Sequence, residues 1–105
     1  MNKRNYRVCM HTPMGTKYGN MLLLTEDGAI SGSFEILRKK QPINGTVGKD
    51  GNCELTGSLV TLMNIFKYQA TGNITEDKIL LTLNCGKHKF KLEGVALGDG
   101  KEKVD

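Results

Sequence analysis

The chain has no tryptophan, only two prolines and no long apolar run. Its most hydrophobic short segment, Met21 to Leu24, is far below the roughly 20 residues that a membrane-spanning helix needs. No segment shows helical periodicity, and the basic start from Met1 to Arg7 is not followed by the apolar stretch of a secretory signal. We therefore expect a soluble cytoplasmic protein with no membrane partner.

Cysteine is also scarce: Cys9, Cys53 and Cys85 form an odd set without the dense spacing of a disulfide scaffold, which favours reduced thiols. The length of 105 residues leaves room for one domain. We expect that domain to span residues 1–97, followed by a polar C-terminal tail over residues 98–105.

What the sequence does contain is alternation with a period of two, divided by turn residues into eight runs of strand length. A basic connection, Arg38-Lys39-Lys40, separates the third run from the fourth, and Pro42 is a suitable first strand residue. The expected strands are Asn5 to Thr12, Lys17 to Thr25, Ala29 to Leu37, a run opened by Pro42 and ended by Asp50-Gly51, Asn52 to Leu62, Ile65 to Ile74, Lys78 to Asn84, and a last run that includes Phe90 to Ala96.

Six of these runs contain a glycine close to large side chains: Gly19, Gly32, Gly45, Gly57, Gly72 and Gly94. At least five of them share a face with the apolar residues of their strand, so they point inward. An inward glycine lets a strand bend sharply across the interior, as strands of a closed sheet must. With short connections throughout, the pattern predicts an all-β fold: an eight-stranded antiparallel up-and-down meander closed into a small barrel.

The segment from Asp27 to Phe34 carries a turn glycine, a hydrophobe, a second glycine and an aromatic. In this it resembles the first hairpin of the avidin and streptavidin barrels, and with the eight-run meander the chain is similar to a small calycin-like barrel, a class that includes the lipocalins. The resemblance implies a small ligand in the lumen. It does not extend to biotin, because the tryptophans that enclose biotin in that family have no counterpart here.

A barrel of eight strands has an interior that side chains fill or that holds one small ligand. We expect a non-catalytic protein that binds a small hydrophobic ligand at the barrel mouth. The larger inward candidates are Tyr6, Met10, Met21, Phe34, Leu59, Tyr68 and Phe90. The alternative is a filled barrel that serves as a structural or protein-interaction module.

Four potential metal ligands lie near the ends of the first and last strands: Cys9, His11, Cys85 and His88. Two thiols and two imidazoles suit tetrahedral zinc in identity. Their spacing differs from the usual zinc pairs, and Cys9 and His11 lie on the face opposite Val8, whereas His88 shares a face with Phe90. We expect no bound cofactor, and this set is the candidate should a metal bind.

Enzymatic chemistry has little support, because His11 and His88 are the only histidines and neither has an identifiable partner in the sequence. A non-catalytic role is therefore the expectation, with a minor enzyme that uses these histidines as the remaining alternative.

Two surface features bear on the choice of partners. Outward aliphatic residues form a surface for self-association if they gather on one side; they are Leu22, Leu24, Val60, Leu62 and Leu80. The net charge of +4 has basic clusters at Arg38-Lys39-Lys40 and from His88 to Lys91. Because the nearby aromatics are assigned to the inside, where they cannot stack on bases, we do not expect a nucleic-acid partner.

Overall fold

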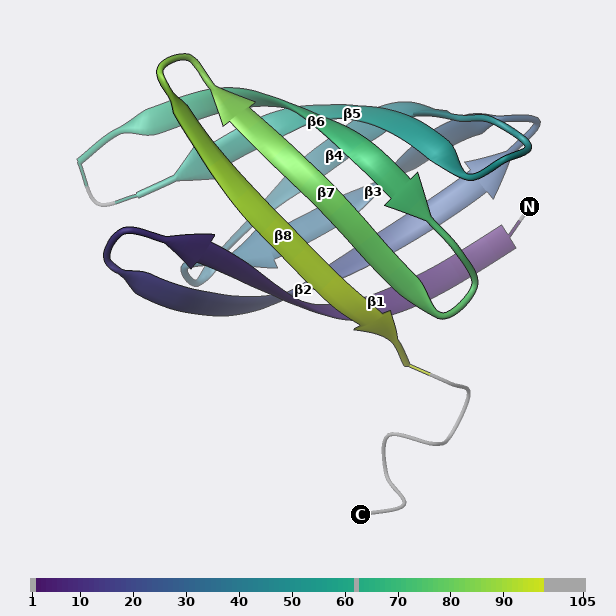
Figure 1. Ribbon diagram of the computed structural model, residues 1–105, viewed down its shortest axis with the longest axis horizontal. Coiled ribbons are helices and arrows are strands. Elements are labelled where there is room, and N and C mark those ends of the chain that lie inside the picture. The colour runs from purple at the N-terminus through teal and green to yellow at the C-terminus, as the bar shows by residue number, and fades with distance from the viewer. Residues whose placement is uncertain (1, 62, 98–105) are drawn as a thin grey trace.

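The computed structural model describes residues 2–61 and 63–97, and these form a closed barrel of eight antiparallel strands (Figure 1). In chain order the strands are β1 (Asn2–Thr12), β2 (Gly15–Glu26), β3 (Ala29–Ile36), β4 (Lys39–Val47), β5 (Asn52–Val60), β6 (Ile65–Ile74), β7 (Lys78–Cys85) and β8 (His88–Ala96). Each strand pairs with its neighbour in sequence, and β8 pairs with β1. The predicted fold is confirmed, while the expected tail over residues 98–105 lies outside the described residues.

Within the described part of the chain, no helix is long and apolar enough to cross a membrane.

The barrel closes because alternation of apolar and polar residues holds across all eight strands. Along β1, Tyr6, Val8 and Met10 are buried, whereas the residues between them face outward. The closing ladder runs from the pair Tyr6 and Ala96 to the pair His11 and Lys91. A one-residue shift in this register would move the buried set to solvent, so the hydrophobic pattern fixes the closure.

The inward glycines lie where neighbouring strands come closest. A Cβ atom at Gly72 would collide with the backbone carbonyl oxygen of Leu80 on β7. At Gly32 the Cβ would collide with the carbonyl oxygen of Leu22, and the φ of +152° is one that L-residues rarely adopt. The glycines thus permit close backbone approach at the bends of the strands, as the sequence pattern predicted.

The start of β4 differs from the prediction. The strand begins at Lys39 rather than at Pro42, because Leu37 and Arg38 alone form the turn, with φ values of 57° and 65°. Pro42 pairs with Ser33 inside the β3–β4 ladder, and the ladder to β5 begins one residue later at Ile43. The turn escaped prediction because neither of its residues is the glycine or asparagine that such turns favour.

The interior is filled by side chains. The buried cluster comprises Tyr6, Val8, Met10, Met21, Leu23, Ile30, Phe34, Ile36, Ile43, Cys53, Leu55, Leu59, Tyr68, Ala70, Ile79, Leu81, Leu83, Cys85 and Leu92. Phe34 of β3 and Tyr68 of β6 meet edge to face across the barrel, with ring centroids 6.3 Å apart. Tyr68 lies over its cross-strand partner Gly57, which has no side chain to occupy that space. The core therefore joins opposite walls of the barrel.

The hairpin connections divide between the two ends of the barrel. The turns β1–β2, β3–β4, β5–β6 and β7–β8 lie at the left end in Figure 1, and the turns β2–β3, β4–β5 and β6–β7 lie at the right end, near the N-terminus. The turns at the two ends differ in charge and in exposed apolar residues.

Candidate functional site

Six of the seven predicted lumen residues are buried in the core: Tyr6, Met10, Met21, Phe34, Leu59 and Tyr68. The seventh, Phe90, is half-buried and packs against the edge of the core. These side chains fill the interior of the barrel. A ligand at one end of the barrel would therefore contact the partly exposed residues of that end and not the six buried side chains.

The two buried tyrosines differ in how their hydroxyl groups are satisfied. The Tyr6 hydroxyl donates a hydrogen bond of 2.8 Å to the carbonyl oxygen of Thr75, in the β6–β7 turn. The Tyr68 hydroxyl is buried and has no hydrogen-bond partner among the described residues. Burial raises the pKa of both phenols. Tyr6 thus ties the core to one end of the barrel, whereas Tyr68 carries an unmet polar group inside it.

The left end of the barrel is basic and has exposed apolar tips. Met14 and Met63 are each 86% exposed on the β1–β2 and β5–β6 connections, and Phe66, at the start of β6, is 38% exposed. Among the described turn residues at this end, Arg38 and Lys87 carry charge and no carboxylate occurs. We call this end the basic mouth; its members are Met14, Leu37, Arg38, Lys39, Lys40, Met63, Phe66, Lys87, His88, Lys89 and Phe90.

The two basic clusters that the sequence presented separately lie at the same end of the barrel, on opposite sides of its rim, because the β3–β4 and β7–β8 turns are four strands apart in the closed order of eight. His88 and Phe90 stack with their ring planes 10° apart and their centroids 6.2 Å apart. Since Phe90 packs against the core, its ring has one side on the protein and is only half accessible at the mouth. The mouth therefore combines cationic side chains with apolar and aromatic surface.

The opposite end is acidic. Its three turns contain Asp27, Asp50, Glu76 and Asp77, with Lys49 as the basic residue among them. Arg4 forms an ion pair of 3.6 Å with Glu76. We call the turns at residues 27–28, 48–51 and 75–77 the acidic end. The turn residues at the two ends thus differ in charge, although Glu35 lies opposite Lys40 near the basic mouth and Lys78 follows the β6–β7 turn at the acidic end.

The β3–β4 turn at the basic mouth is strained. Leu37 and Arg38 both have left-handed backbone conformations, which cost non-glycine residues roughly 1–2 kcal/mol each. Leu37 packs partly against the core, whereas Arg38 is exposed. The equivalent two-residue turn at the acidic end is Asp27-Gly28, a favourable pair for this geometry. The β3–β4 turn thus has two unfavourable residues at positive φ, whereas the β2–β3 turn has aspartate and glycine, which tolerate it.

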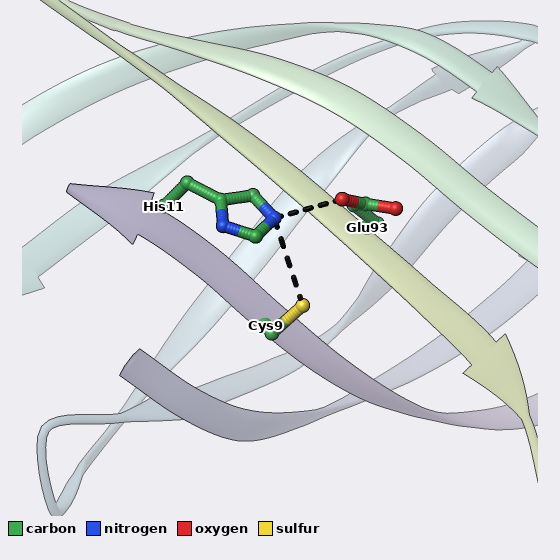
Figure 2. A group of neighbouring side chains, drawn as sticks. All are labelled: Cys9, His11 and Glu93. Atoms are coloured by element: carbon green, nitrogen blue, oxygen red, sulfur yellow. Dashed lines mark hydrogen bonds and ion pairs between the residues drawn. The ribbon is translucent and has the colours of Figure 1, made fainter. Parts of the chain in front are cut away.

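A cluster of potential metal ligands lies on the outer surface of the barrel (Figure 2). It contains Cys9 and His11 from β1, as predicted, together with Glu93 from β8. The His11 Nε2 atom lies 2.7 Å from a Glu93 carboxylate oxygen and 3.9 Å from the Cys9 sulfur. Among the described residues, the structure therefore groups Glu93, rather than Cys85 or His88, with the first two.

The other two predicted ligands lie elsewhere. Cys85 is buried at the end of β7, where burial raises the pKa of its thiol, and His88 lies against Phe90 at the basic mouth. Glu93 is not among the predicted ligands, because alternation along its strand indicates only that it faces outward. The β1–β8 register, which places Glu93 directly opposite Cys9, is the signal that identifies it once the barrel is closed.

Of the predicted outward aliphatic residues, Leu80 is 55% exposed, and Leu22, Leu24 and Val60 are half-buried. Leu62 lies outside the described residues. A shallow groove of about 400 Å³ runs over β1, β7 and β8, bordered by Leu80 and by two exposed residues absent from the prediction, Tyr18 and Val95. Of the four predicted residues that the structure describes, Leu80 alone borders this groove, and Leu22, Leu24 and Val60 do not.

Comparison of the chain with protein-family models, with curated proteins and with solved structures gave no match.

Proposed function

We propose that the protein is a non-catalytic, calycin-like barrel that binds a small hydrophobic ligand carrying negative charge across its basic mouth. The observation that carries this proposal is that the turns at one end of the barrel carry cationic and exposed apolar residues, whereas the turns at the other end carry carboxylates. Arg38 and Lys87 provide charge in the turns, and Met14, Met63 and Phe66 provide exposed apolar surface.

The filled core determines where such a ligand would lie. Because Phe34 and Tyr68 meet across the interior, an apolar chain would rest on the half-accessible Phe66 and Phe90 instead of entering the barrel. Its acidic group would then lie among the lysine and arginine side chains that surround the mouth. Cations at an apolar surface favour an anionic amphiphile over a neutral or cationic one.

The strained turn supports the same proposal. Leu37 contributes apolar contact and Arg38 contributes charge at adjacent positions. Asparagine and glycine at these two positions would give a more stable turn but would remove both groups. A cost to folding that supplies two ligand-compatible side chains is expected at a binding site.

The test is a calorimetric titration with dodecanoate, kept below its micelle concentration, and a matched titration with dodecyltrimethylammonium. We expect dodecanoate to bind and the cationic amphiphile to bind at least tenfold more weakly. Replacing Arg38, Lys39 and Lys40 together by glutamine should weaken dodecanoate binding at least tenfold. The control matched in charge, Lys3→Gln with Lys49→Gln and Lys78→Gln near the acidic end, should leave it unchanged.

Equal affinity for the two amphiphiles, or no binding of either, would contradict the proposal. So would equal losses from the variants at the two ends, because the effect would then come from net charge alone.

A second candidate function is self-association through the outer surface. The observation that favours it is the exposed set Tyr18, Leu80 and Val95 around one groove. Sedimentation at millimolar concentration should then show a dimer that the double variant Leu80→Lys with Val95→Lys converts to monomer. A wild-type mass equal to one chain under these conditions would remove this candidate.

A further inference from the structure

Three different donor atoms converge on one point of the outer surface, between β1 and β8 (Figure 2). Cys9 and His11 are two residues apart on the same strand, so their side chains lie on the same face. Glu93 lies opposite Cys9 in the neighbouring strand. The sulfur, nitrogen and oxygen atoms all lie within 4.8 Å of one another.

The orientation of the histidine ring is fixed from its other side. The Thr16 hydroxyl on β2 lies 3.3 Å from Nδ1 of His11, and Thr16 is the cross-strand partner of His11. This contact turns Nε2 toward Cys9 and Glu93. Histidines that bind metals commonly have a hydrogen-bond partner at the second ring nitrogen, which sets the ring orientation.

The arrangement differs from that of a nucleophilic triad. In a triad the nucleophile and the carboxylate contact opposite nitrogens of the imidazole, so that a proton moves across the ring. Here the Cys9 sulfur and the Glu93 carboxylate both face Nε2, and Nδ1 faces a hydroxyl. Convergence of three donors on one point is the geometry of ligands around an ion.

We propose that Cys9, His11 and Glu93 form a three-ligand site for a borderline-soft divalent transition-metal ion, with zinc the best match and the fourth position open to solvent. Zinc accepts sulfur, imidazole nitrogen and carboxylate oxygen in one tetrahedral site, at about 2.3, 2.0 and 2.0–2.2 Å. Calcium and magnesium require oxygen ligands, of which this cluster offers a single carboxylate.

The required adjustment of the side chains is small. Those bond lengths in a tetrahedron separate sulfur from nitrogen by about 3.5 Å and nitrogen from oxygen by about 3.3 Å. The present separations are 3.9 and 2.7 Å, and the His11 and Glu93 side chains are 46% and 57% exposed. These two separations change by roughly half an ångström, and the sulfur–oxygen separation, which lies within 4.8 Å, must reach about 3.6 Å. Rotation of the exposed His11 and Glu93 side chains achieves this without moving the strands.

The test uses full-length protein, purified without an affinity tag and with its thiols reduced. Titration with Co²⁺ should give one metal ion per chain and a thiolate-to-cobalt absorption band, which zinc should then displace. Cys9→Ser should abolish the band although Cys53 and Cys85 remain. His11→Gln and Glu93→Gln should each weaken zinc binding at least tenfold, whereas His88→Gln and Glu54→Gln serve as matched controls that leave it unchanged.

A second measurement separates metal binding from folding. Thermal unfolding of each variant in chelator should match that of the wild type, because all three side chains are at least partly exposed. Zinc should also slow alkylation of Cys9, located by mass spectrometry, in the wild type but not in His11→Gln. Absence of the cobalt–thiolate band, retention of the band in Cys9→Ser, or one metal ion per two chains would overturn the site.

Discussion

The two ends of the barrel each contain a two-residue hairpin turn, and the two turns are built from different residues. At the acidic end a two-residue hairpin turn uses Asp27-Gly28, and the Tyr6 hydroxyl is bonded to the carbonyl of Thr75 in a neighbouring turn. At the basic mouth the corresponding turn uses Leu37 and Arg38 in left-handed conformations. The first turn follows the local rules of folding and the second departs from them, and such departures concentrate at functional sites.

The difference extends to charge and exposed apolar surface. The turns of the acidic end carry four exposed carboxylates, whereas the turns of the basic mouth carry the exposed side chains of Met14 and Met63 together with Arg38 and Lys87. A single core connects the two ends, so stability and binding should respond to different substitutions. Substitutions in the core should change stability, and substitutions at the basic mouth should change binding.

The largest effect should come from the aromatic contact that spans the barrel. Phe34→Ala removes a fully buried ring and its contact with Tyr68, so we expect a loss of about 3–5 kcal/mol in the free energy of unfolding. Phe66→Ala, at the basic mouth, should cost about 1 kcal/mol because the ring is partly exposed. Urea denaturation measures both, and similar losses would contradict the division between core and mouth.

Alkaline pH should destabilise the protein through its buried thiols. Burial raises the pKa of Cys53, near the acidic end, from 9.0 to about 11. The folded protein then holds this proton more tightly than the unfolded chain, so stability is intact below pH 9 and falls as pH rises toward 11. The loss should reach about 1–3 kcal/mol.

Cys53→Ala should flatten this decline in urea midpoints measured between pH 8 and 11. Cys85→Ala, near the basic mouth, should flatten it less, because Cys85 is less deeply buried than Cys53. A decline in Cys53→Ala as steep as that of the wild type would show that other groups control alkaline unfolding, with the buried tyrosines the next to examine.

The turn residues offer a direct exchange between the two ends. Leu37→Asn with Arg38→Gly should stabilise the fold by about 1 kcal/mol by relieving left-handed strain. The same double variant should lose dodecanoate affinity. The reverse change at the acidic end, Asp27→Leu with Gly28→Arg, should destabilise by about 1–2 kcal/mol without affecting binding. Thermal unfolding measures the stability of each variant, and calorimetry measures its affinity for dodecanoate. Destabilisation by Leu37→Asn with Arg38→Gly would contradict the expected relief of backbone strain.

The smallest effect should come from the two tyrosine hydroxyls, and its sign should differ between them. Tyr6→Phe loses the hydrogen bond to Thr75 and should destabilise by about 1 kcal/mol. Tyr68→Phe removes a buried hydroxyl without a partner among the described residues and should stabilise by about 1 kcal/mol. Changes of the same sign would mean that the two hydroxyls are equally satisfied.

Much of the fold was predictable because alternation is a local signal in all eight strands, and inward glycines agree with it in at least five of them. Gly57 illustrates this: its place on the apolar face indicated a bend, and the structure adds that Tyr68 fills the space beside it. The start of β4 was not predictable, because Leu37 and Arg38 lack the turn chemistry that marks a two-residue hairpin.

The candidate sites depended on long-range register, which the sequence pattern does not specify. The inward positions of Tyr6 and Phe34 follow from alternation alone, but whether they fill the lumen depends on contacts across the barrel. Glu93 joins Cys9 and His11 only through the closing ladder. Likewise, the basic segments at Arg38 and Lys87 lie at the same end of the barrel because alternate hairpin turns do.

The most direct test of the contrast between the two ends is a nuclear magnetic resonance titration of labelled protein with dodecanoate. The account predicts that backbone amide shifts change at residues 14, 37–40, 63, 66 and 87–90, and that residues 27–28, 48–51 and 75–77 stay unperturbed. Shift changes centred on the acidic end, or none at saturating dodecanoate, would contradict the assignment of binding to the basic mouth.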